Sequence, residues 1–351
     1  MSASADIPST AAAVQISGFT FYNPATPIES FLSISSVPVP KPGPGEALVR
    51  LTLRPVNPSD LFSVGGVYPG FKPATMPAIP GLEGMGTVAA LGPDTASSGV
   101  AVGQRVTCLT WGAEAGNGTW QQYSVVKADT LVVVPDDVTD EFAASAVINP
   151  VTIIGLLDAA ALPEGEYLLI NSSGSALNRM LLQLARKRGL KVIGVIRREA
   201  QREEILAMGA VGVVVSEDGS GIADAVKEIT GGKLAYVAFD CIAGPGFKHF
   251  VAAVRDGGTI YNYGGQGGAE LSVSIMDTIF RGMIVKGFWL AIYIKEIGPV
   301  RAKALLAEVM DLAKEGIFVA QKGQHFALED VLQALAQHDT MGRDSKFYIE
   351  G

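Results

Sequence analysis

The sequence predicts an α/β protein of two units, a mostly antiparallel β unit and a doubly wound parallel sheet of six strands. Three observations support this prediction. The chain of 351 residues is about twice the size of a usual single domain. Residues 14–150 consist of short stretches rich in Val, Leu and Thr between Gly and Pro residues, which is typical of antiparallel strands. From about residue 151, strands alternate with helices, which predicts parallel strands joined by right-handed crossovers.

The predicted elements follow in order along the chain. In the first unit, the clearest strands cover residues 46–53, 86–91 and 103–109. The second unit has predicted strands over 167–171, 191–196, 211–215, 235–238, 258–263 and near 284–290, with helices over 177–188, 201–208 and around 247–254. Two amphipathic helices follow over 301–314 and 329–338, and a final strand over 346–349 is expected to return to the first unit.

Composition excludes several classes of function. The formal net charge is −8 and no stripe of Lys and Arg is present, which disfavours nucleic acid as a partner. No apolar run approaches the roughly 20 residues that span a bilayer, so no membrane insertion is expected. With only Cys108 and Cys241, neither a disulfide framework nor a four-cysteine zinc site is possible, which favours a reducing compartment.

The first 13 residues contain no Arg or Lys, unlike a secretory signal or a transit peptide. We therefore expect a cytoplasmic protein. The mitochondrion is the alternative if a targeting segment is absent from this sequence.

The turn after the strand at 167–171 is a candidate dinucleotide site. Small residues there let the backbone approach a pyrophosphate, which a helix N-terminus attracts through its free N–H groups. Of the glycine fingerprint only Gly174 remains, because Ala176 and Asn178 stand where glycines are usual. The alternative is an ordinary tight turn between strand and helix. The predicted cofactor-binding residues of this turn are Ser173, Gly174, Ser175, Ala176 and Leu177.

Three arginines close to the end of the next strand indicate which dinucleotide binds. An acidic residue at this place holds the ribose 2′-hydroxyl of NAD, whereas a 2′-phosphate calls for Arg. The chain has Arg197, Arg198 and Arg202 here, which favours NADPH. The alternative is a solvated charged loop in which they pair with Glu199 and Glu203.

Several short motifs give the chain a family resemblance. They are Asn57-Pro-Ser-Asp60, Gly66-Val-Tyr-Pro69, Pro80-Gly-Leu-Glu-Gly-Met-Gly86, Gly118-Thr-Trp-Gln-Gln-Tyr123, Asn149-Pro-Val-Thr152, Tyr263-Gly-Gly265 and Lys286-Gly-Phe-Trp-Leu290. Over nearly its whole length the chain resembles the medium-chain dehydrogenase/reductase superfamily. Within it, the zinc-free 2-enoyl thioester (enoyl-CoA/ACP) reductases are most similar and the quinone oxidoreductases come next.

This resemblance implies a domain organisation and a partner. Residues 1–150 and 291–351 would form a GroES-like catalytic domain, and residues 151–290 a Rossmann domain that binds NADPH. A homodimer joined through the edge strands of two Rossmann sheets is also implied. The metal-using relatives have a Cys within the segment matching 55–60 and a His where this chain has Leu82, so no catalytic zinc is expected.

The resemblance also implies roles for single residues. Tyr68 matches a tyrosine of the enoyl thioester reductases, and a tyrosine hydroxyl is protonated at neutral pH and can donate that proton. Tyr68 is the predicted catalytic residue; the alternative is a loop tyrosine that only packs. Asn57 would lie beside the nicotinamide ribose. Asn149 and Thr152 would contact the nicotinamide at a hinge between domains, or cap a helix.

The remaining predicted site residues follow strands of the second unit or are large aromatics. Tyr263, Gly264 and Gly265 end a strand where a glycine pair permits backbone contact with the nicotinamide carboxamide. Phe288 and Trp289 are placed at the cofactor, and Trp289 and Trp120 in an apolar acyl pocket. Large aromatics at such a junction are also commonly core residues.

The sequence therefore predicts an NADPH-dependent oxidoreductase that reduces the activated C=C bond of a 2-enoyl thioester, as in fatty acid metabolism. An NADPH:quinone or α,β-unsaturated ketone reductase is the alternative enzyme. A crystallin-like protein that binds NADPH without catalysis is the alternative outside enzymes. Acyl length and carrier are left open.

Overall fold

The computed structural model describes residues 7–18, 30–338 and 345–351. The chain divides into two compact units. Unit 1 contains Met1–Ile148 and Ile297–Gly351, and unit 2 contains Asn149–Glu296. Unit 1 is thus assembled from two separate parts of the chain, whereas unit 2 is continuous.

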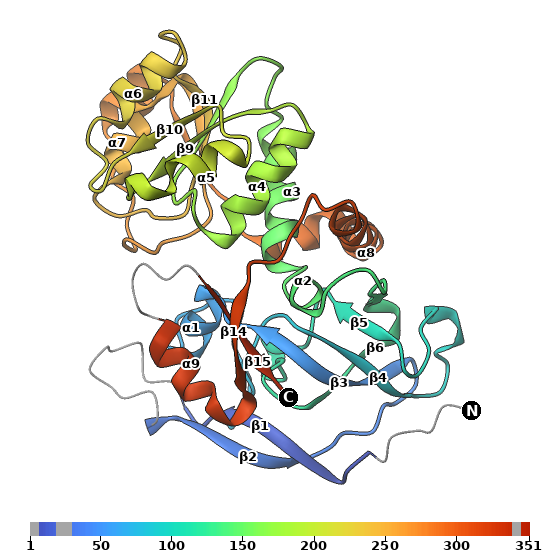
Figure 1. Cartoon of the computed structure of the whole chain (residues 1–351). Helices are drawn as coiled ribbons and strands as arrows, with labels where there is room; N and C mark the ends of the chain where they lie inside the picture. Colours follow the sequence, from blue (N-terminus) through green and yellow to red (C-terminus); the bar gives the residue numbers. More distant parts are fainter. Residues whose placement is uncertain (1–6, 19–29, 339–344) are drawn as a thin grey trace. The chain divides into compact units, whose positions relative to one another are not determined.

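Unit 1 is built around a seven-stranded sheet in the order β14-β15-β3-β4-β5-β7, with β6 paired to β3 (Figure 1). All pairs in this sheet are antiparallel except β14 with β15. A separate antiparallel pair is formed by β1 and β2. The strands are β1 Thr10–Ile16, β2 Leu32–Pro38, β3 Glu46–Pro55, β4 Met85–Leu91, β5 Arg105–Cys108, β6 Tyr123–Lys127, β7 Leu131–Val133, β14 Gly323–Ala327 and β15 Lys346–Glu350.

The helices described in unit 1 are α1 Pro58–Val64, α2 Asp140–Ala144 and α9 Val331–His338, and α8 Leu290–Lys314 begins in unit 2 and ends in unit 1. Short 3-10 turns of unit 1 lie at Ala96–Ser98, Ala113–Ala115, Ala128–Thr130 and Leu328–Asp330. As expected, the last strand of the chain returns to the first unit, where β15 pairs with β3. Apolar side chains from β1, α1, α9 and β15 form one core with Trp120, and a second core lies among β3, β4 and β5.

Unit 2 is a six-stranded parallel sheet in the order β10-β9-β8-β11-β12-β13. Its strands are β8 Tyr167–Ile170, β9 Lys191–Ile196, β10 Gly212–Val215, β11 Ala235–Asp240, β12 Val254–Asn262 and β13 Ile284–Gly287. Its helices are α3 Ile148–Ala160, α4 Ala176–Lys187, α5 Arg202–Ala207, α6 Ile222–Ile229 and α7 Phe247–Ala252, with a 3-10 turn at Glu199–Gln201 and a π-helical turn at Met276–Phe280. In Figure 1, α6 and α7 lie on one side of the strands and α4 and α5 on the other. This strand order and these layers confirm the predicted α/β class with a doubly wound sheet.

Local sequence explains how the helix α4 begins and ends. Ser175 is its N-cap, and the Ser175 hydroxyl accepts a hydrogen bond from the Asn178 N–H at 3.3 Å. Arg186 and Lys187 in the last turn suit the negative end of the helix dipole. The same strand-to-helix connection contains the candidate cofactor turn.

Two predicted helices differ from the observed ones. The helix expected around 247–254 ends at Ala252, because β12 already begins at Val254. The helix expected over 301–314 is the second part of α8, which starts at Leu290 and is kinked at Gly298, where φ is 75°. Pro299 follows directly, and its ring cannot continue the helical hydrogen bonds of the preceding turn.

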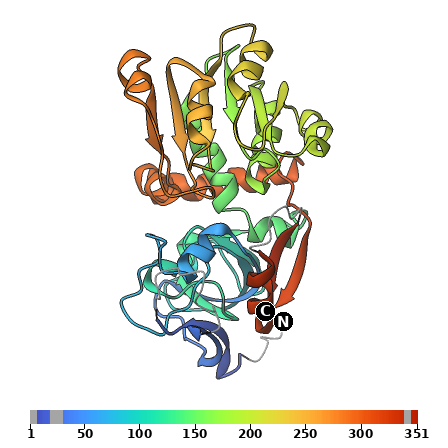
Figure 2. The ribbon, with the colours of Figure 1, turned by 90° about the vertical axis from the view of Figure 1, so that its left-hand side faces the viewer.

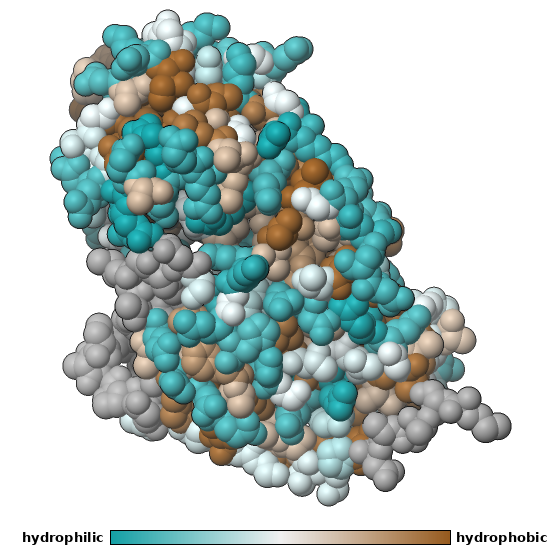
Figure 3. Space-filling view, in the orientation of Figure 1, coloured by the Kyte–Doolittle hydropathy of each residue, from teal (hydrophilic) through white to brown (hydrophobic). Residues whose placement is uncertain are grey.

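On the face shown in Figure 3, hydrophilic side chains predominate and apolar ones occur in small groups. Among the described residues, no helix has the length and the apolar character needed to cross a bilayer. An apolar group of a different kind lies at the edge of unit 2, where Ile275, Met276, Ile279 and Phe280 are each more than half exposed.

Candidate functional site

The candidate cofactor turn lies in unit 2 between β8 and α4. Ser172 has a left-handed backbone with φ of 51°, which turns the chain toward the helix. Ser173 is fully buried, and its hydroxyl donates to the Val195 carbonyl of the neighbouring strand at 3.1 Å. Within the described part of the chain, the backbone N–H groups of Gly174, Ala176 and Leu177 donate no hydrogen bond to another backbone group. Free N–H groups at a helix N-terminus are suited to hold a pyrophosphate.

Gly174 leaves room for a close neighbour. A Cβ at this position would lie 2.6 Å from Nε2 of Gln201, so the end of the Gln201 side chain would have to move if Gly174 were replaced. Arg179 braces the same turn, because its Nε donates to the Gly174 carbonyl at 2.9 Å. The Arg179 guanidinium also makes a bidentate ion pair with Glu204 at the other side of the turn.

Asn178 has a structural role that the sequence did not reveal. It stands where a third glycine is usual, is fully buried, and donates from Nδ2 to the Asn171 carbonyl at 2.7 Å. Its Oδ1 accepts a hydrogen bond from the Tyr263 hydroxyl at 3.3 Å. The amide therefore ties the helix start to the ends of two strands, which replaces the close packing that glycine permits.

A polar cluster gathers at the carboxyl ends of β8, β11 and β12. Asp240 is buried and accepts hydrogen bonds from the side chains of Asn171 and Asn262, the latter at 2.6 Å. Burial is the main cause that raises the pKa of the Tyr263 hydroxyl well above its ordinary value, and the nearby Cys241 adds to it. Burial likewise raises the pKa of the Cys241 thiol to about 12. Tyr263 and Cys241 are therefore neutral groups at physiological pH.

The three predicted arginines of the adenosine end differ in their surroundings. Arg197 and Arg198 are exposed directly after β9. The Arg202 guanidinium pairs with Glu199, and its Nη1 donates to the Val213 carbonyl at 2.9 Å. The pairing with Glu199 is the local contact that the alternative interpretation of this loop expects.

The other predicted residues of unit 2 lie in helices and loops around the sheet. Gly264 packs against Cys241, whose carbonyl oxygen would be 2.8 Å from an added Cβ, whereas Gly265 is exposed. Phe288 and Trp289 are partly buried, and the Phe288 ring packs on Tyr293 with centroids 5.6 Å apart. Asn149 and Thr152 are buried inside α3, so neither is the N-cap of that helix.

In unit 1, Tyr68 lies in the loop after α1. The Tyr68 N–H donates to the Phe62 carbonyl at 3.1 Å, and the ring is partly buried against the core that contains Phe71. The loop borders an open hollow of about 420 Å³. It is lined by Gly66, Val67, Tyr68, Pro69, Phe71, Lys72 and Pro73.

Asn57 belongs to a buried charged cluster of the same unit. Its Nδ2 donates to Glu83 Oε1 at 2.8 Å, and its Oδ1 accepts a hydrogen bond from the Lys346 ammonium. Its backbone N–H donates to Asp60 Oδ2 at 2.8 Å. Both ends of the Asn57 amide are thus already engaged with protein groups.

Trp120 lies in the core. It is fully buried, and its ring packs against Gly81, where an added Cβ would lie 2.4 Å from Trp120 Cδ1. A side chain without exposed surface offers no wall to an acyl chain, so the packing alternative accounts for Trp120. Among the residues that the structure describes, no group of three or more His, Cys, Asp and Glu side chains could hold a metal ion.

The structure thus brings the predicted residues together in two sets. Ser173, Gly174, Ser175, Ala176 and Leu177 form one turn with Arg197 and Arg198 near it in unit 2, and Tyr68 lines a hollow in unit 1. Asp60, Glu83, Lys346, Asn171, Asn178 and Asp240 were not predicted. The one sequence signal that could have indicated a buried charged group is a charged residue inside an otherwise apolar motif, such as Glu83 within 80–86.

Family models match both units. Residues 43–136 match the alcohol dehydrogenase GroES-like domain. Residues 176–302 match the family described as zinc-binding dehydrogenase. The first match falls in unit 1, and the second falls largely in unit 2.

Individual relatives include mitochondrial enoyl-[acyl-carrier-protein] reductases. The human protein of that name is 30% identical over 299 residues, which cover 82% of this chain and 76% of the relative. The Arabidopsis thaliana protein of the same name is 31% identical over 278 residues, which cover 77% of this chain and 71% of the relative.

Among solved structures, a Bacillus thuringiensis protein assigned as an NADPH:quinone reductase has a TM-score of 0.86. It is 26% identical and covers 97% of this chain and 99% of its own.

Proposed function

Because the chain belongs to the medium-chain dehydrogenase/reductase superfamily and to its zinc-independent enoyl reductase type, we propose that it is an NADPH-dependent reductase of 2-enoyl thioesters. Membership makes it an NAD(P)-dependent oxidoreductase. The choice of NADPH over NADH and the choice of substrate are the parts proposed here.

Unit 2 fits a dinucleotide at the turn that begins α4. The N–H groups of Gly174, Ala176 and Leu177 would bind the pyrophosphate. Arg197 and Arg198 would bind the 2′-phosphate, because a guanidinium recognises phosphate oxygens in pairs. Arg202 pairs with Glu199 and donates to the Val213 carbonyl, so we assign it to holding the loop in place. NADPH supplies a hydride when bound.

Tyr68 carries the proposal for the reaction. Reduction of an enoyl thioester needs a hydride at the β carbon, a hydrogen bond to the enolate oxygen and a proton at the α carbon. A tyrosine hydroxyl in a mainly apolar hollow is suited to donate that hydrogen bond or that proton. The hollow's aromatic and proline residues would also offer an apolar surface to the acyl chain.

Quinone reduction is the second candidate, and the solved structure assigned as an NADPH:quinone reductase favours it. Both candidate substrates require hydride transfer. A quinone, however, needs neither a proton at a carbon nor a residue that donates it from one fixed side. Dependence on Tyr68 therefore separates the two functions.

The test is a Tyr68→Phe variant with crotonyl-CoA and with a quinone, each under NADPH oxidation. We expect turnover of crotonyl-CoA to fall about 100-fold or more, as for the loss of a general acid, with unchanged NADPH affinity. Tyr123→Phe is the matched control, a partly buried tyrosine of unit 1 outside the hollow. Turnover of the quinone alone by the wild-type chain, or full activity of Tyr68→Phe on the thioester, would reject the proposal.

We further propose that two copies form a homodimer through the free edge of β13. In the described part of the chain, β13 pairs with β12 only and is the last strand of the sheet (Figure 2). Next to it, the exposed fractions of Ile275, Met276, Ile279 and Phe280 are 70%, 58%, 68% and 71%. An apolar group of this kind at a strand edge is typical of a subunit interface.

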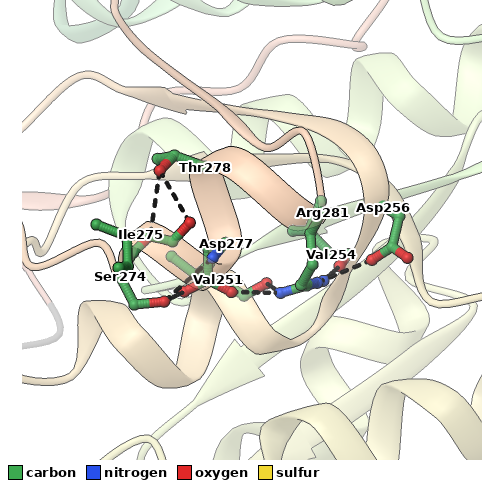
Figure 4. A network of polar contacts seen from close by, with 8 residues as sticks. All are labelled: Val251, Val254, Asp256, Ser274, Ile275, Asp277, Thr278 and Arg281. Carbon is green, nitrogen blue, oxygen red and sulfur yellow. Dashed lines mark hydrogen bonds and ion pairs between the residues drawn. The ribbon is translucent and has the colours of Figure 1, made fainter.

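The apolar turn at this edge is held rigidly. Arg281 pairs with Asp256 and Asp277, each at 2.8 Å, and donates to the Val254 carbonyl (Figure 4). The Ser274 hydroxyl donates to Asp277 at 2.6 Å. A rigid turn loses little conformational entropy when its apolar side chains are buried by a partner.

For the compartment, the two cysteines are informative. Cys108 and Cys241 are both buried and unpaired, which fits a reducing environment. We propose the cytoplasm, with the mitochondrion as the alternative that the relatives' names support.

A further inference from the structure

A charged cluster with almost no access to water surrounds the start of α1. The exposed fractions of Asp60, Glu83, Asn57 and Lys346 are 0%, 1%, 2% and 7%. Burying charges is costly unless each is paired and hydrogen-bonded. Two carboxylates and an ammonium at such a place need a reason beyond packing.

Asn57 is the centre of this cluster. Its amide N–H donates to Glu83, its amide oxygen accepts from Lys346, and its backbone N–H donates to Asp60. The carboxylates are held from their other sides by the backbone. Glu83 Oε2 accepts from the Ile148 N–H at 2.8 Å, and Asp60 Oδ1 accepts from the Leu82 N–H at 3.0 Å.

Lys346 comes from the far end of the chain. It is the first residue of β15 and lies 289 residues from Asn57. The next residue fixes the alignment, since the Phe347 carbonyl accepts a hydrogen bond from the Val56 N–H at 2.8 Å. The ammonium therefore has a defined position against Asn57.

Backbone hydrogen bonds of α1 and of the turn after it lie between Asn57 and Tyr68. Asn57 is the N-cap of α1, and its carbonyl accepts from the Leu61 N–H at 3.4 Å. Gly65 N–H bonds back to Leu61 at 2.8 Å, and Tyr68 N–H to Phe62 at 3.1 Å. α1 has only seven residues, so a shift at its start displaces the loop after it.

We propose that Lys346 is a positioning residue of the reductase: through Asn57 it fixes the start of α1 and thereby the place of Tyr68 in the hollow. The inference rests on the proposed function in one respect, the catalytic role of Tyr68.

The electrostatics of the cluster agree with this assignment. Burial raises the pKa of Asp60 to about 7 and also raises that of Glu83, and the charge of Lys346 works in the opposite direction on both. Tyr348 of the same strand adds no charge, because burial raises its pKa to about 12. Lys346 is thus the cation of this cluster that favours the ionised form of both carboxylates and limits the rise of their pKa values.

The test compares Lys346→Met, Lys346→Arg and Lys127→Met. Lys127 is a matched control, an exposed lysine of unit 1 that pairs with Glu46 at 3.0 Å. For Lys346→Met we expect kcat on crotonyl-CoA to fall about 100-fold, since small misplacements of a catalytic group have such effects. The acid limb of its pH profile should move up by about one pH unit, because the carboxylates lose their cation. Lys346→Arg should restore most of the activity, and Lys127→Met should match the wild type.

A double variant separates positioning from folding. Glu83→Gln together with Lys346→Met removes an opposite pair of charges, so the Tm should recover relative to Lys346→Met. If Lys346 positions Tyr68, kcat stays low in this stable double variant. Recovery of kcat together with Tm would mean that the cluster only balances buried charge, and would overturn the inference.

Amide hydrogen exchange tests the positioning role of Lys346 without any measurement of enzyme activity. We expect faster exchange of the amides of Leu61, Gly65 and Tyr68 in Lys346→Met and in the double variant, and no change in Lys127→Met. If the wild-type chain reduces neither thioester nor quinone, the proposed function fails while this measurement still stands. Unchanged exchange at residues 61–68 would overturn the positioning role.

Discussion

Arg197 and Arg198 present two exposed guanidinium groups directly after β9, and this placement makes a prediction about cofactor choice. Replacing both by Gln should weaken NADPH binding about 10- to 100-fold, because hydrogen bonds to a charged phosphate are lost. Binding of NADH, which has no 2′-phosphate, should not change. Fluorescence titration with each cofactor measures both affinities.

Arg202→Gln is the control for this pair. Its guanidinium is occupied by Glu199 and by the Val213 carbonyl, so its loss should affect NADPH much less. Equal weakening of NADPH and NADH in the Arg197/Arg198 variant would contradict a phosphate-binding role and support the solvated charged loop.

The raised pKa of Asp60 predicts how the free energy of unfolding depends on pH. Its pKa is raised from 3.8 to about 7, chiefly by burial and in part by the charge of Glu83, so the folded chain holds a proton that the unfolded chain releases. The protonated Asp60 carboxyl therefore makes its full contribution to the free energy of unfolding below about pH 4, and this contribution is lost as the pH rises through about 7. Since one pKa unit corresponds to about 1.4 kcal/mol, the loss is on the order of a few kcal/mol.

Asp60→Asn removes this titration. Urea unfolding between pH 4.5 and 8 should show a wild-type free energy of unfolding that falls relative to the variant up to about pH 7 and runs parallel to it above. Parallel curves over the whole range would show that the Asp60 pKa is not raised.

Among the elements, β9 supports the cofactor turn through one glycine. A Cβ on Gly194 would lie 2.8 Å from the Ser173 hydroxyl and 3.1 Å from Ile205 Cγ2. Gly194→Ala should push Ser173 away, lower stability by about 1–3 kcal/mol as overpacking does, and weaken NADPH binding. Thermal unfolding and cofactor titration check the two effects.

Gly246→Ala is the matched control in unit 2. The nearest atom to its added Cβ is the Asp218 carbonyl oxygen at 3.6 Å, an ordinary contact. It should bind NADPH like the wild type. A Gly194→Ala chain with wild-type affinity would show that Ser173 does not hold the turn in place.

The elements of unit 2 were predictable for two reasons. Strands buried between two layers of helices are continuous apolar runs, and the helices between them repeat their apolar residues with the helical period. The strand predicted over 191–196 has the observed bounds Lys191–Ile196. α1 is different: seven residues contain too little periodicity to reveal a helix. The kink of α8 at Gly298 also depends on a backbone angle that a pattern of apolar residues does not encode.

The candidate site was predictable only where local sequence determines it. The turn at Gly174 follows from one strand and one helix that are adjacent in the chain. The contact between Asn57 and Lys346 does not, since 289 residues separate them and neither residue type is unusual alone. The burial of Trp120 was not predictable for a related reason, because it depends on β1 and α9 packing around it.

At the scale of the whole molecule, the apolar residues beside the edge of β13 lead us to expect a homodimer. Ile279→Glu with Phe280→Glu places charges in the proposed interface, and charges buried there without partners oppose association. Analytical ultracentrifugation should show a dimer for the wild type and a monomer for the variant.

Leu206→Glu with Val211→Glu is the control for this surface. These side chains are 37% and 48% exposed in unit 2 and lie outside the segment 275–280. This variant should remain a dimer. A wild-type monomer at micromolar concentration, or a dimer that survives Ile279→Glu with Phe280→Glu, would reject the proposed interface.

The division of unit 1 into two stretches of sequence has a consequence for biosynthesis. During translation, Asn149–Glu296 leaves the ribosome complete, and a continuous domain of this size is able to fold at once. The amino-terminal half of unit 1 must wait, with the edge of β3 open and two buried carboxylates still without their lysine, until β15 emerges. A nascent chain in this state exposes the edge of β3 at Leu53–Pro55, which only β15 covers, so chaperone binding during synthesis should concentrate on this edge and end when β15 is added.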